Sequence, residues 1–472
     1  RTARPDTLLL RVGCAALLDR GIPEAMAGVR AGVDGGRVMP RMMTVKRNLR
    51  ILLFLSAAFA SGCDRGGDGP SRAQATPTPA HAGLTLEVRE SASPAGPDSR
   101  EPELTSSADG RLILSWIEKL GEKRHALRFA VRDAAGWSEA RTVAEGDNWF
   151  VNWADFPSVV ALADGSLAAH WLVKSGKGTY AYDVYIARSK NNGQSWDRPV
   201  VPHTDGTQTE HGFVSLLPLA DGRLGAVWVD GRATEGLKEE HGGEEAPLPV
   251  SMQLRYAAID ADGKLSDEAV LDERICECCQ TSAAMTSEGP IAAYRNRSER
   301  EVRDIHFVRR QGAGWSGARP VHADNWEING CPVNGPSVAA EGRRVALAWF
   351  TGEGNSPRVQ VAFSVDAGAT FGAPARVDDG EAMGRVDVVL LADGSALVSW
   401  MAGDAEGGAN KVRRIAPDGT PGPVAIISRT DVSRSSGFPR MTRLGDTIYF
   451  AWTQFGKPSQ VRTTTADVSA IK

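Results

Sequence analysis

Four cysteines in the second half of the chain have the spacing to bind a metal or to form disulfides. They are Cys276, Cys278, Cys279 and Cys331. In an exported protein, an even set of cysteines predicts disulfides. One would join Cys331 to Cys278 or Cys279, and the other would be a tight link within the C-x-C-C segment. That segment lacks the spacing of an ordinary zinc module, but a copper or zinc site with His211 or His322 nearby remains the alternative.

Three arginines stand at the starts of apolar runs that lie far apart in the chain. They are Arg100, Arg385 and Arg440. Guanidinium groups bind carboxylates through paired hydrogen bonds, so three around one pocket would suit an anionic ligand. Alternatively, each arginine pairs with an acidic neighbour such as Glu101, Asp387 or Asp155.

Two carboxyl groups occupy similar positions in other parts of the chain. Asp155 could serve as a general acid, and Glu210, which precedes His211, could serve as a base. We expect His211 to contribute to ligand binding. All of these residues are distant in sequence, so the fold must gather them.

A repeated sequence pattern indicates how the fold gathers them. In each repeat, a small-residue turn is followed by an apolar run that ends in an aromatic residue. The aromatics are Trp116, Trp171, Trp228, Tyr294, Trp349, Trp400 and Trp452, spaced 51 to 66 residues apart. Such a period in a strand-rich pattern predicts a β-propeller. The chemistry-bearing residues then lie at the mouth of its central channel, where each unit's first strand begins.

Two turns carry a further signature. Ser189–Trp196 and Ser364–Phe371 resemble the Asp-box, S-x-D-x-G-x-x-W, of sialidases and BNR-repeat proteins, although Asn191 and Phe371 depart from the pattern. The Ser and Asx side chains cap the turn, and the glycine takes a positive φ. The resemblance covers about residues 84–472 and implies a sialidase-like propeller.

The number of blades follows from the fourth strands. Units one to six each carry one, at 139–143, 199–202, 269–271, 318–321, 373–377 and 424–427. The seventh unit lacks one, whereas the strand at 84–90 lacks a blade. Joining them closes the ring and removes exposed edges. We therefore predict an all-β fold with seven four-stranded antiparallel blades, where typical sialidases have six.

The resemblance also implies roles. Arg100-Glu-Pro102 is similar to the motif that opens sialidase domains, whose arginine helps to bind a carboxylate. Retaining sialidases also need an acid, here Asp155, and a tyrosine nucleophile assisted by a glutamate. None of the six tyrosines stands at a channel start in a late blade. Tyr294 and Tyr449 are interpreted as core strand residues, and the others fall in third-strand regions: Tyr180, Tyr182 and Tyr185 in unit two and Tyr256 in unit three. This pattern disfavours orthodox catalysis.

The N-terminal region predicts export. Residues 1–41 show no periodicity and are interpreted as a non-native upstream extension. Residues 42–63 have basic residues, a short apolar run and Ser61-Gly62-Cys63, which resembles a lipobox. Cys63 would then be lipidated, and residues 64–83 would form a flexible tether. We expect a cell-envelope protein held at the membrane by its lipid anchor only.

Composition narrows the functional classes. The chain has 472 residues and a net charge of −4, which does not suggest nucleic-acid binding. The leading hypothesis is a monomeric propeller that binds an anionic carbohydrate or another small anion and needs no cofactor. The alternatives are a divergent exo-α-sialidase and a metal or redox protein that uses the cysteines.

Overall fold

The structure is a computed structural model that describes residues 88–471, apart from 108, 134, 237–250 and 405. The chain divides into two units, residues 1–78 and 79–472. The predicted upstream extension, signal peptide, Cys63 and tether lie outside the described residues. Within the described ranges, no helix has the length and apolar character needed to cross a membrane.

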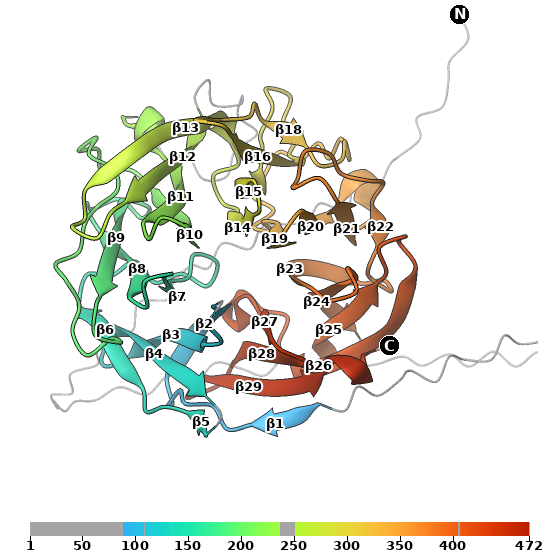
Figure 1. The fold of residues 1–472 in the computed structure, drawn as a ribbon, viewed down its shortest axis with the longest axis horizontal. Coiled ribbons are helices and arrows are strands. Elements are labelled where there is room, and N and C mark those ends of the chain that lie inside the picture. The colour runs from blue at the N-terminus through green and yellow to red at the C-terminus, as the bar shows by residue number, and fades with distance from the viewer. Residues whose placement is uncertain (1–87, 108, 134, 237–250, 405, 472) are drawn as a thin grey trace, which may run out of the picture. The chain divides into compact units, whose positions relative to one another are not determined.

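Seven antiparallel sheets form a ring in the second unit, with the first strand of each sheet toward the centre (Figure 1). This confirms the predicted seven-bladed propeller. The first four blades are β2 (Ser99–Ser106), β3 (Leu112–Lys119), β4 (His125–Asp133), β5 (Gly136–Trp137) and β6 (Arg141–Gly146); β7 (Ser158–Ala161), β8 (Leu167–Lys174) and β9 (Tyr182–Ser189); β10 (His211–Pro218), β11 (Leu224–Asp230), β12 (Met252–Ile259) and β13 (Leu265–Ile275); and β14 (Ser282–Thr286), β15 (Gly289–Arg295), β16 (Ile305–Gln311), β17 (Gly314–Trp315) and β18 (Arg319–Pro320).

The last three blades complete the ring. They are β19 (Ser337–Glu341), β20 (Arg344–Thr351), β21 (Arg358–Ser364) and β22 (Ala375–Arg376); β23 (Ala382–Leu390), β24 (Ala396–Asp404), β25 (Gly407–Ile415) and β26 (Pro421–Thr430); and β27 (Arg440–Leu444), β28 (Thr447–Gln454), β29 (Gln460–Asp467) and β1 (Arg89–Ser91). The helices of the described residues are single 3₁₀ turns at Arg232–Thr234, Glu353–Asn355, Arg434–Ser436 and Val468–Ala470.

The ring closes as the sequence predicts, but the closing strand is Arg89–Ser91, and residues 84–87 of the predicted strand lie outside the described residues. Strand β1 pairs antiparallel with β29, with Arg89 opposite Thr465. The hydroxyl groups of Thr463 and Thr464 also donate to the carbonyl oxygens of Ser91 and Arg89, at 2.9 and 2.7 Å. The N-terminal strand therefore supplies the outer edge of the last blade.

The outer strand of the second blade is weaker than predicted. The expected strand at 199–202 is reduced to a single bridge between Ile186 and Val200. Pro199 and Pro202 lack the backbone N–H that a ladder needs, which explains why no continuous strand forms.

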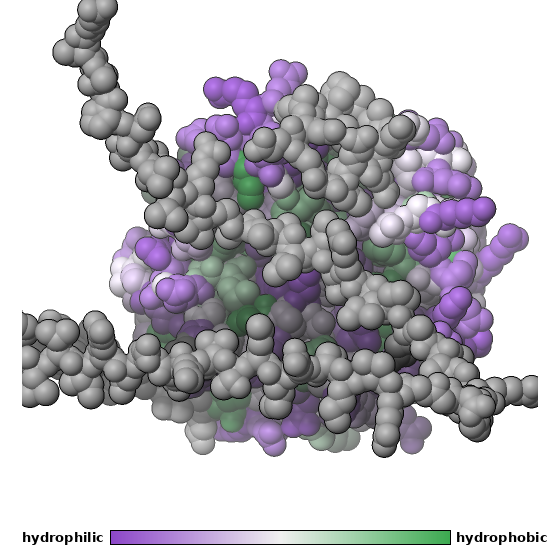
Figure 2. Space-filling model, turned by 180° about the vertical axis from the view of Figure 1, so that it is seen from behind, coloured by the Kyte–Doolittle hydropathy of each residue, from purple (hydrophilic) through white to green (hydrophobic). Residues whose placement is uncertain are grey.

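The core lies between neighbouring blades, where the repeated aromatics pack. Trp116, Trp349 and Trp400 are at most 1% exposed, whereas Trp452 is half-buried. In the view from behind, hydrophilic residues form most of the described periphery, and hydrophobic ones show nearer the middle (Figure 2). Stability thus comes mainly from apolar contacts between blades.

The two Asp-box-like turns have the local geometry that their sequences predict. The Ser189 hydroxyl accepts the Gly193 N–H at 2.8 Å, and Asn191 accepts the Ser195 N–H at 2.9 Å. A Cβ atom on Gly193, whose φ is 77°, would lie 2.2 Å from the Phe129 ring. Both turns follow the third strand of their blade, so they support the scaffold.

Candidate functional site

A connection reaches across the centre of the ring, which we call the hub. Between β6 and β7, Trp153 stacks on Phe438 at 5.8 Å, and the Ala154 carbonyl accepts the Gln280 side-chain amide at 2.6 Å. These partners belong to the connections before the seventh and fourth blades. The repeat pattern does not predict this crossing segment, which fills part of the centre between the blades.

The crossing segment places Asp155 in a hydrogen-bonded group with Tyr182 and Glu210. The Tyr182 hydroxyl lies 2.9 Å from Asp155 Oδ2 and 2.8 Å from Glu210 Oε1. Asp155 Oδ1 also accepts the Phe213 N–H at 2.9 Å. The structure therefore brings the two predicted catalytic carboxyl groups together around Tyr182, a tyrosine of the third-strand region that the sequence pattern did not place at the hub.

Tyr182 could have been found by counting strands. In an antiparallel blade, the first and third strands begin at the same end. Tyr182 is the first residue of the third strand, β9, so it lies at the same end as His211, which begins β10.

The phenol hydrogen of Tyr182 cannot satisfy both carboxyl groups at once. A phenol has a single hydrogen, so it donates to only one carboxylate at a time. Burial raises the pKa of Asp155 to about 7, although the hydrogen bond from Tyr182 opposes the rise. Burial likewise raises the pKa of Glu210 well above its usual range, and the charge of Asp155 adds to this effect. One carboxyl group therefore holds a proton near neutral pH and can donate it back to the phenol oxygen.

Glu101 is a further buried carboxyl group of the hub. It is 4% exposed, its Oε2 makes no hydrogen bond, and its φ is 56°. Burial raises its pKa to about 8; Arg100 opposes the rise, and Asp155 adds to it. The Nε atom of half-buried Arg100 also lacks a hydrogen bond. The hub thus contains a third buried carboxyl group, close enough to Asp155 for their charges to interact.

The other two predicted arginines are already engaged. Arg440 forms a two-pronged ion pair with Glu103, at 2.8 and 3.0 Å, and lies 3.6 Å from Asp387. Arg385 donates to the carbonyls of Gly437 and Ser433 and stacks over Trp153 at 4.8 Å. Burial lowers the pKa of Arg385 to about 10, and the charge of Arg434 contributes. The expected pocket with three free guanidinium groups is therefore absent from the described residues.

A cavity of about 160 Å³ does lie in the hub. Its polar lining comes from four blades and the connection before β14, and consists of Glu103, Ser158, Ser215, Arg440, Gln280 and Thr281. Its rings are Phe156 and Phe438. Of the predicted ligand-binding arginines, Arg440 alone lines it.

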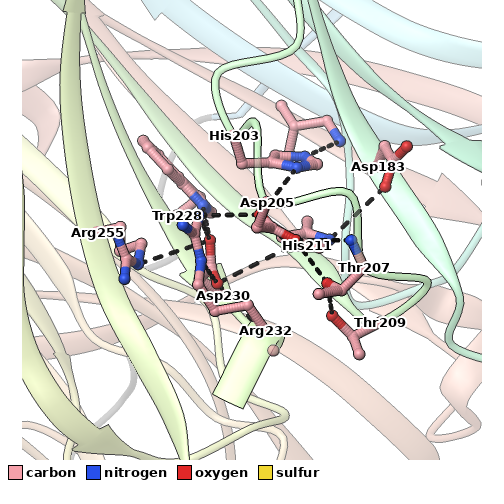
Figure 3. Close-up of polar contacts among 12 residues, drawn as sticks. Asp183, His203, Asp205, Thr207, Thr209, His211, Trp228, Asp230, Arg232 and Arg255 are labelled. Carbon is pink, nitrogen blue, oxygen red and sulfur yellow. Dashed lines mark hydrogen bonds and ion pairs between the residues drawn. The ribbon is translucent and has the colours of Figure 1, made fainter. Parts of the chain in front are cut away.

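His211 lies inside the wall of the third blade. Its ring is fully buried and stacks on His203 at 3.7 Å. Figure 3 shows Asp183 on one side of it and Asp205 and Asp230 on the other, with the nearest carboxylate oxygen 3.3 Å from Nε2. The ring does not line the hub cavity, so the geometry gives the predicted ligand-binding role of His211 no support.

The four cysteines do gather at one place, as predicted. Cys276 Sγ lies 3.7 Å from Cys278 Sγ and 3.6 Å from Cys279 Sγ, while the Cys331 thiol neighbours Cys278. All four are free thiols in this structure. The geometry contains no S–S bond, which would be about 2.05 Å long, and the disulfides stay a prediction.

Comparison with known proteins gives similarities of fold only. No protein-family model and no curated sequence matches the chain. Solved structures similar to it include a protein of unknown function from Dyadobacter fermentans (14% identity, TM-score 0.46, 82% of this chain and 98% of that chain covered). Others are the NanB sialidase of Streptococcus pneumoniae (15%, 0.44, 84% and 72%) and the GH93 α-L-arabinofuranosidase of Fusarium graminearum (12%, 0.45, 82% and 98%). Similarities this weak carry no information about ligand or activity.

Proposed function

We propose that this chain is an exported propeller lipoprotein whose hub binds a small anionic glycan, or a similar anion, without cleaving it. The hub cavity supports this proposal because it combines hydroxyl and amide groups with aromatic rings, the pairing that suits a sugar's hydroxyl groups and apolar faces. The N-terminal sequence supports export and lipid attachment at Cys63.

The main observation in support of the proposal is the ion pair between Arg440 and Glu103 in the cavity wall. Burial raises the pKa of Glu103 to about 7, although the charge of Arg440 opposes the rise; Asp387 adds to it. When Glu103 gains a proton, Arg440 loses its main competitor for a ligand carboxylate. Asp387 remains 3.6 Å away, but its oxygens also accept the Ser337 hydroxyl and the Met441 N–H. Anion binding should therefore strengthen as the pH falls through 7.

Calorimetric titration with glucuronic acid and N-acetylneuraminic acid tests this proposal. Glu103 is mostly protonated at pH 6 and mostly ionised at pH 8, so we expect about tenfold tighter binding at pH 6. The Glu103→Gln variant should bind equally at both pH values. The matched control Glu406→Gln, on a strongly exposed side chain, should behave as wild type. Absence of binding at both pH values would refute the proposal. Binding by Glu103→Gln that still depends on pH would also refute it.

A divergent exo-α-sialidase is the second candidate, favoured by the group of Asp155, Tyr182 and Glu210. It holds the acid, tyrosine and glutamate that such a reaction needs. However, the Tyr182 ring is fully buried and stacks on Phe150 at 3.9 Å, and burial raises its pKa well above the usual range. Turnover of a fluorogenic sialoside, abolished in Asp155→Ala, would establish this activity. Lack of turnover by a protein that binds sugar supports binding alone.

A further inference from the structure

The cysteine cluster, Cys276, Cys278, Cys279 and Cys331, is built from two separate connections. The first three residues lie between β13 and β14, and the fourth lies between β18 and β19. The sulfur atoms of the first three all lie within 4.8 Å of one another. Folding therefore concentrates thiols from two adjacent blades at the hub.

The sulfur separations match those around a tetrahedral metal ion. A zinc–sulfur bond is about 2.3 Å, which places two sulfur ligands of a tetrahedron about 3.8 Å apart. Cys276 Sγ lies 3.7 and 3.6 Å from the sulfurs of Cys278 and Cys279. A disulfide would need about 2.05 Å. The observed spacing is thus that of ligands around one centre.

Hydrogen-bond donors surround the cluster as they do around metal thiolates. Arg303, whose side chain is 2% exposed, lies with Nη1 3.2 Å from Cys276 Sγ. Glu301 holds this guanidinium from its other side, at 2.8 and 3.1 Å. The Asn334 N–H donates to Cys279 Sγ at 3.4 Å. Such donors orient the ligands and compensate the negative charge of several thiolates.

The cluster is closed on one side and accessible on the other. Cys276 and Cys279 are 1% and 2% exposed, whereas Cys278 is half-buried and Cys331 is exposed. The Cys331 thiol neighbours Cys278 and lies 3.9 Å from Glu277 Oε1. An ion can therefore enter past Cys278 and Cys331 and reach the buried pair.

We propose that Cys276, Cys278 and Cys279 bind a thiophilic closed-shell cation, Zn²⁺ or Cu⁺, with Cys331 available as a fourth donor. These two ions share a preference for thiolate ligands. Each coordinating thiol gives its proton to solvent, so loading releases up to three or four protons and tightens as the pH rises. This site does not depend on ligand binding in the hub cavity.

Metal titration of the full chain, purified under reducing conditions, tests the site. Co²⁺ serves as a spectroscopic probe, since thiolate ligation gives charge-transfer bands in the near ultraviolet. Competition with a zinc-chelating dye and with bicinchoninate then separates Zn²⁺ from Cu⁺. We expect one ion per chain and a loss of affinity on the order of 100-fold or more in Cys276→Ser and Cys279→Ser.

Two further variants keep the test decisive. Cys278→Ser alters the half-buried ligand and should fold normally by near-ultraviolet circular dichroism while losing affinity. Glu406→Gln changes a strongly exposed side chain between β24 and β25, outside the cluster, and should retain the ion. Equal affinity in Cys278→Ser and wild type, or disulfides among the four cysteines with no binding after reduction, would overturn the proposal.

Discussion

Replacing Asp155 by asparagine should flatten the pH dependence of stability. In the folded protein, burial raises the pKa of Asp155 from 3.8 to about 7, so the folded state binds this proton more tightly than the unfolded state does. The corresponding stability is fully present below pH 4 and is lost as the pH rises toward 7. The loss is about 1.4 kcal/mol for each pH unit well below pH 7 and half of that at pH 7, or about 2 kcal/mol in all between pH 5 and pH 7.

Asparagine imitates the protonated carboxyl group. Its oxygen can accept the Phe213 N–H, and its amide can donate to the Tyr182 oxygen, which leaves the phenol hydrogen for Glu210. We therefore expect Asp155→Asn to lack this loss, so that its stability relative to wild type improves by about 2 kcal/mol from pH 5 to pH 7.

Urea denaturation of both proteins at pH 5, 6 and 7 measures this difference. Other raised carboxyl groups, such as Glu101 and Glu103, titrate in both proteins and cancel to first order. Because Asp155 and Glu210 share a proton, the value obtained belongs to the pair. A difference between the two proteins that does not change with pH would refute the shared-proton reasoning.

Three other changes test the scaffold and its hub. Tyr182→Phe removes the hydroxyl that joins the two carboxyl groups and should lower the free energy of unfolding by about 2 kcal/mol in urea titration. Gly193→Ala should cost about 2 to 4 kcal/mol by the same assay, because its φ is 77° and its Cβ would clash with Phe129, whereas Gly121→Ala, with 3.9 Å to its nearest atom, should cost far less. Deletion of residues through Ser91 removes β1 and should lower the urea midpoint, and an unchanged midpoint would contradict the closure.

The sequence was sufficient to predict the ring but not the contents of its hub. The repeated turn and aromatic run report local strand pairing, which each unit determines by itself, and Trp116, Trp349 and Trp400 are buried accordingly. Closure was predictable because the seventh unit lacked an outer strand.

The hub depends on contacts between units, which no repeat encodes. The sequence predicts that Arg385 and Arg440 stand near strand starts. It does not show that Arg385 donates to backbone carbonyls or that Arg440 pairs with Glu103. It also did not show that Trp153 crosses to Phe438. Asp155 and Glu210 were identified as a pair, whereas Tyr182 between them required attention to where third strands begin.

The pairing of β1 with β29 links Ser91 to Thr463 across 372 residues of chain. During synthesis the earlier units can form only an open array, with a free edge at each end, until the final strand has left the ribosome. Joining the two ends must therefore overcome the entropy of closing a loop that spans nearly the whole described chain. A chain truncated within β29 would therefore lose that strand and also the pairing with β1 that closes the ring.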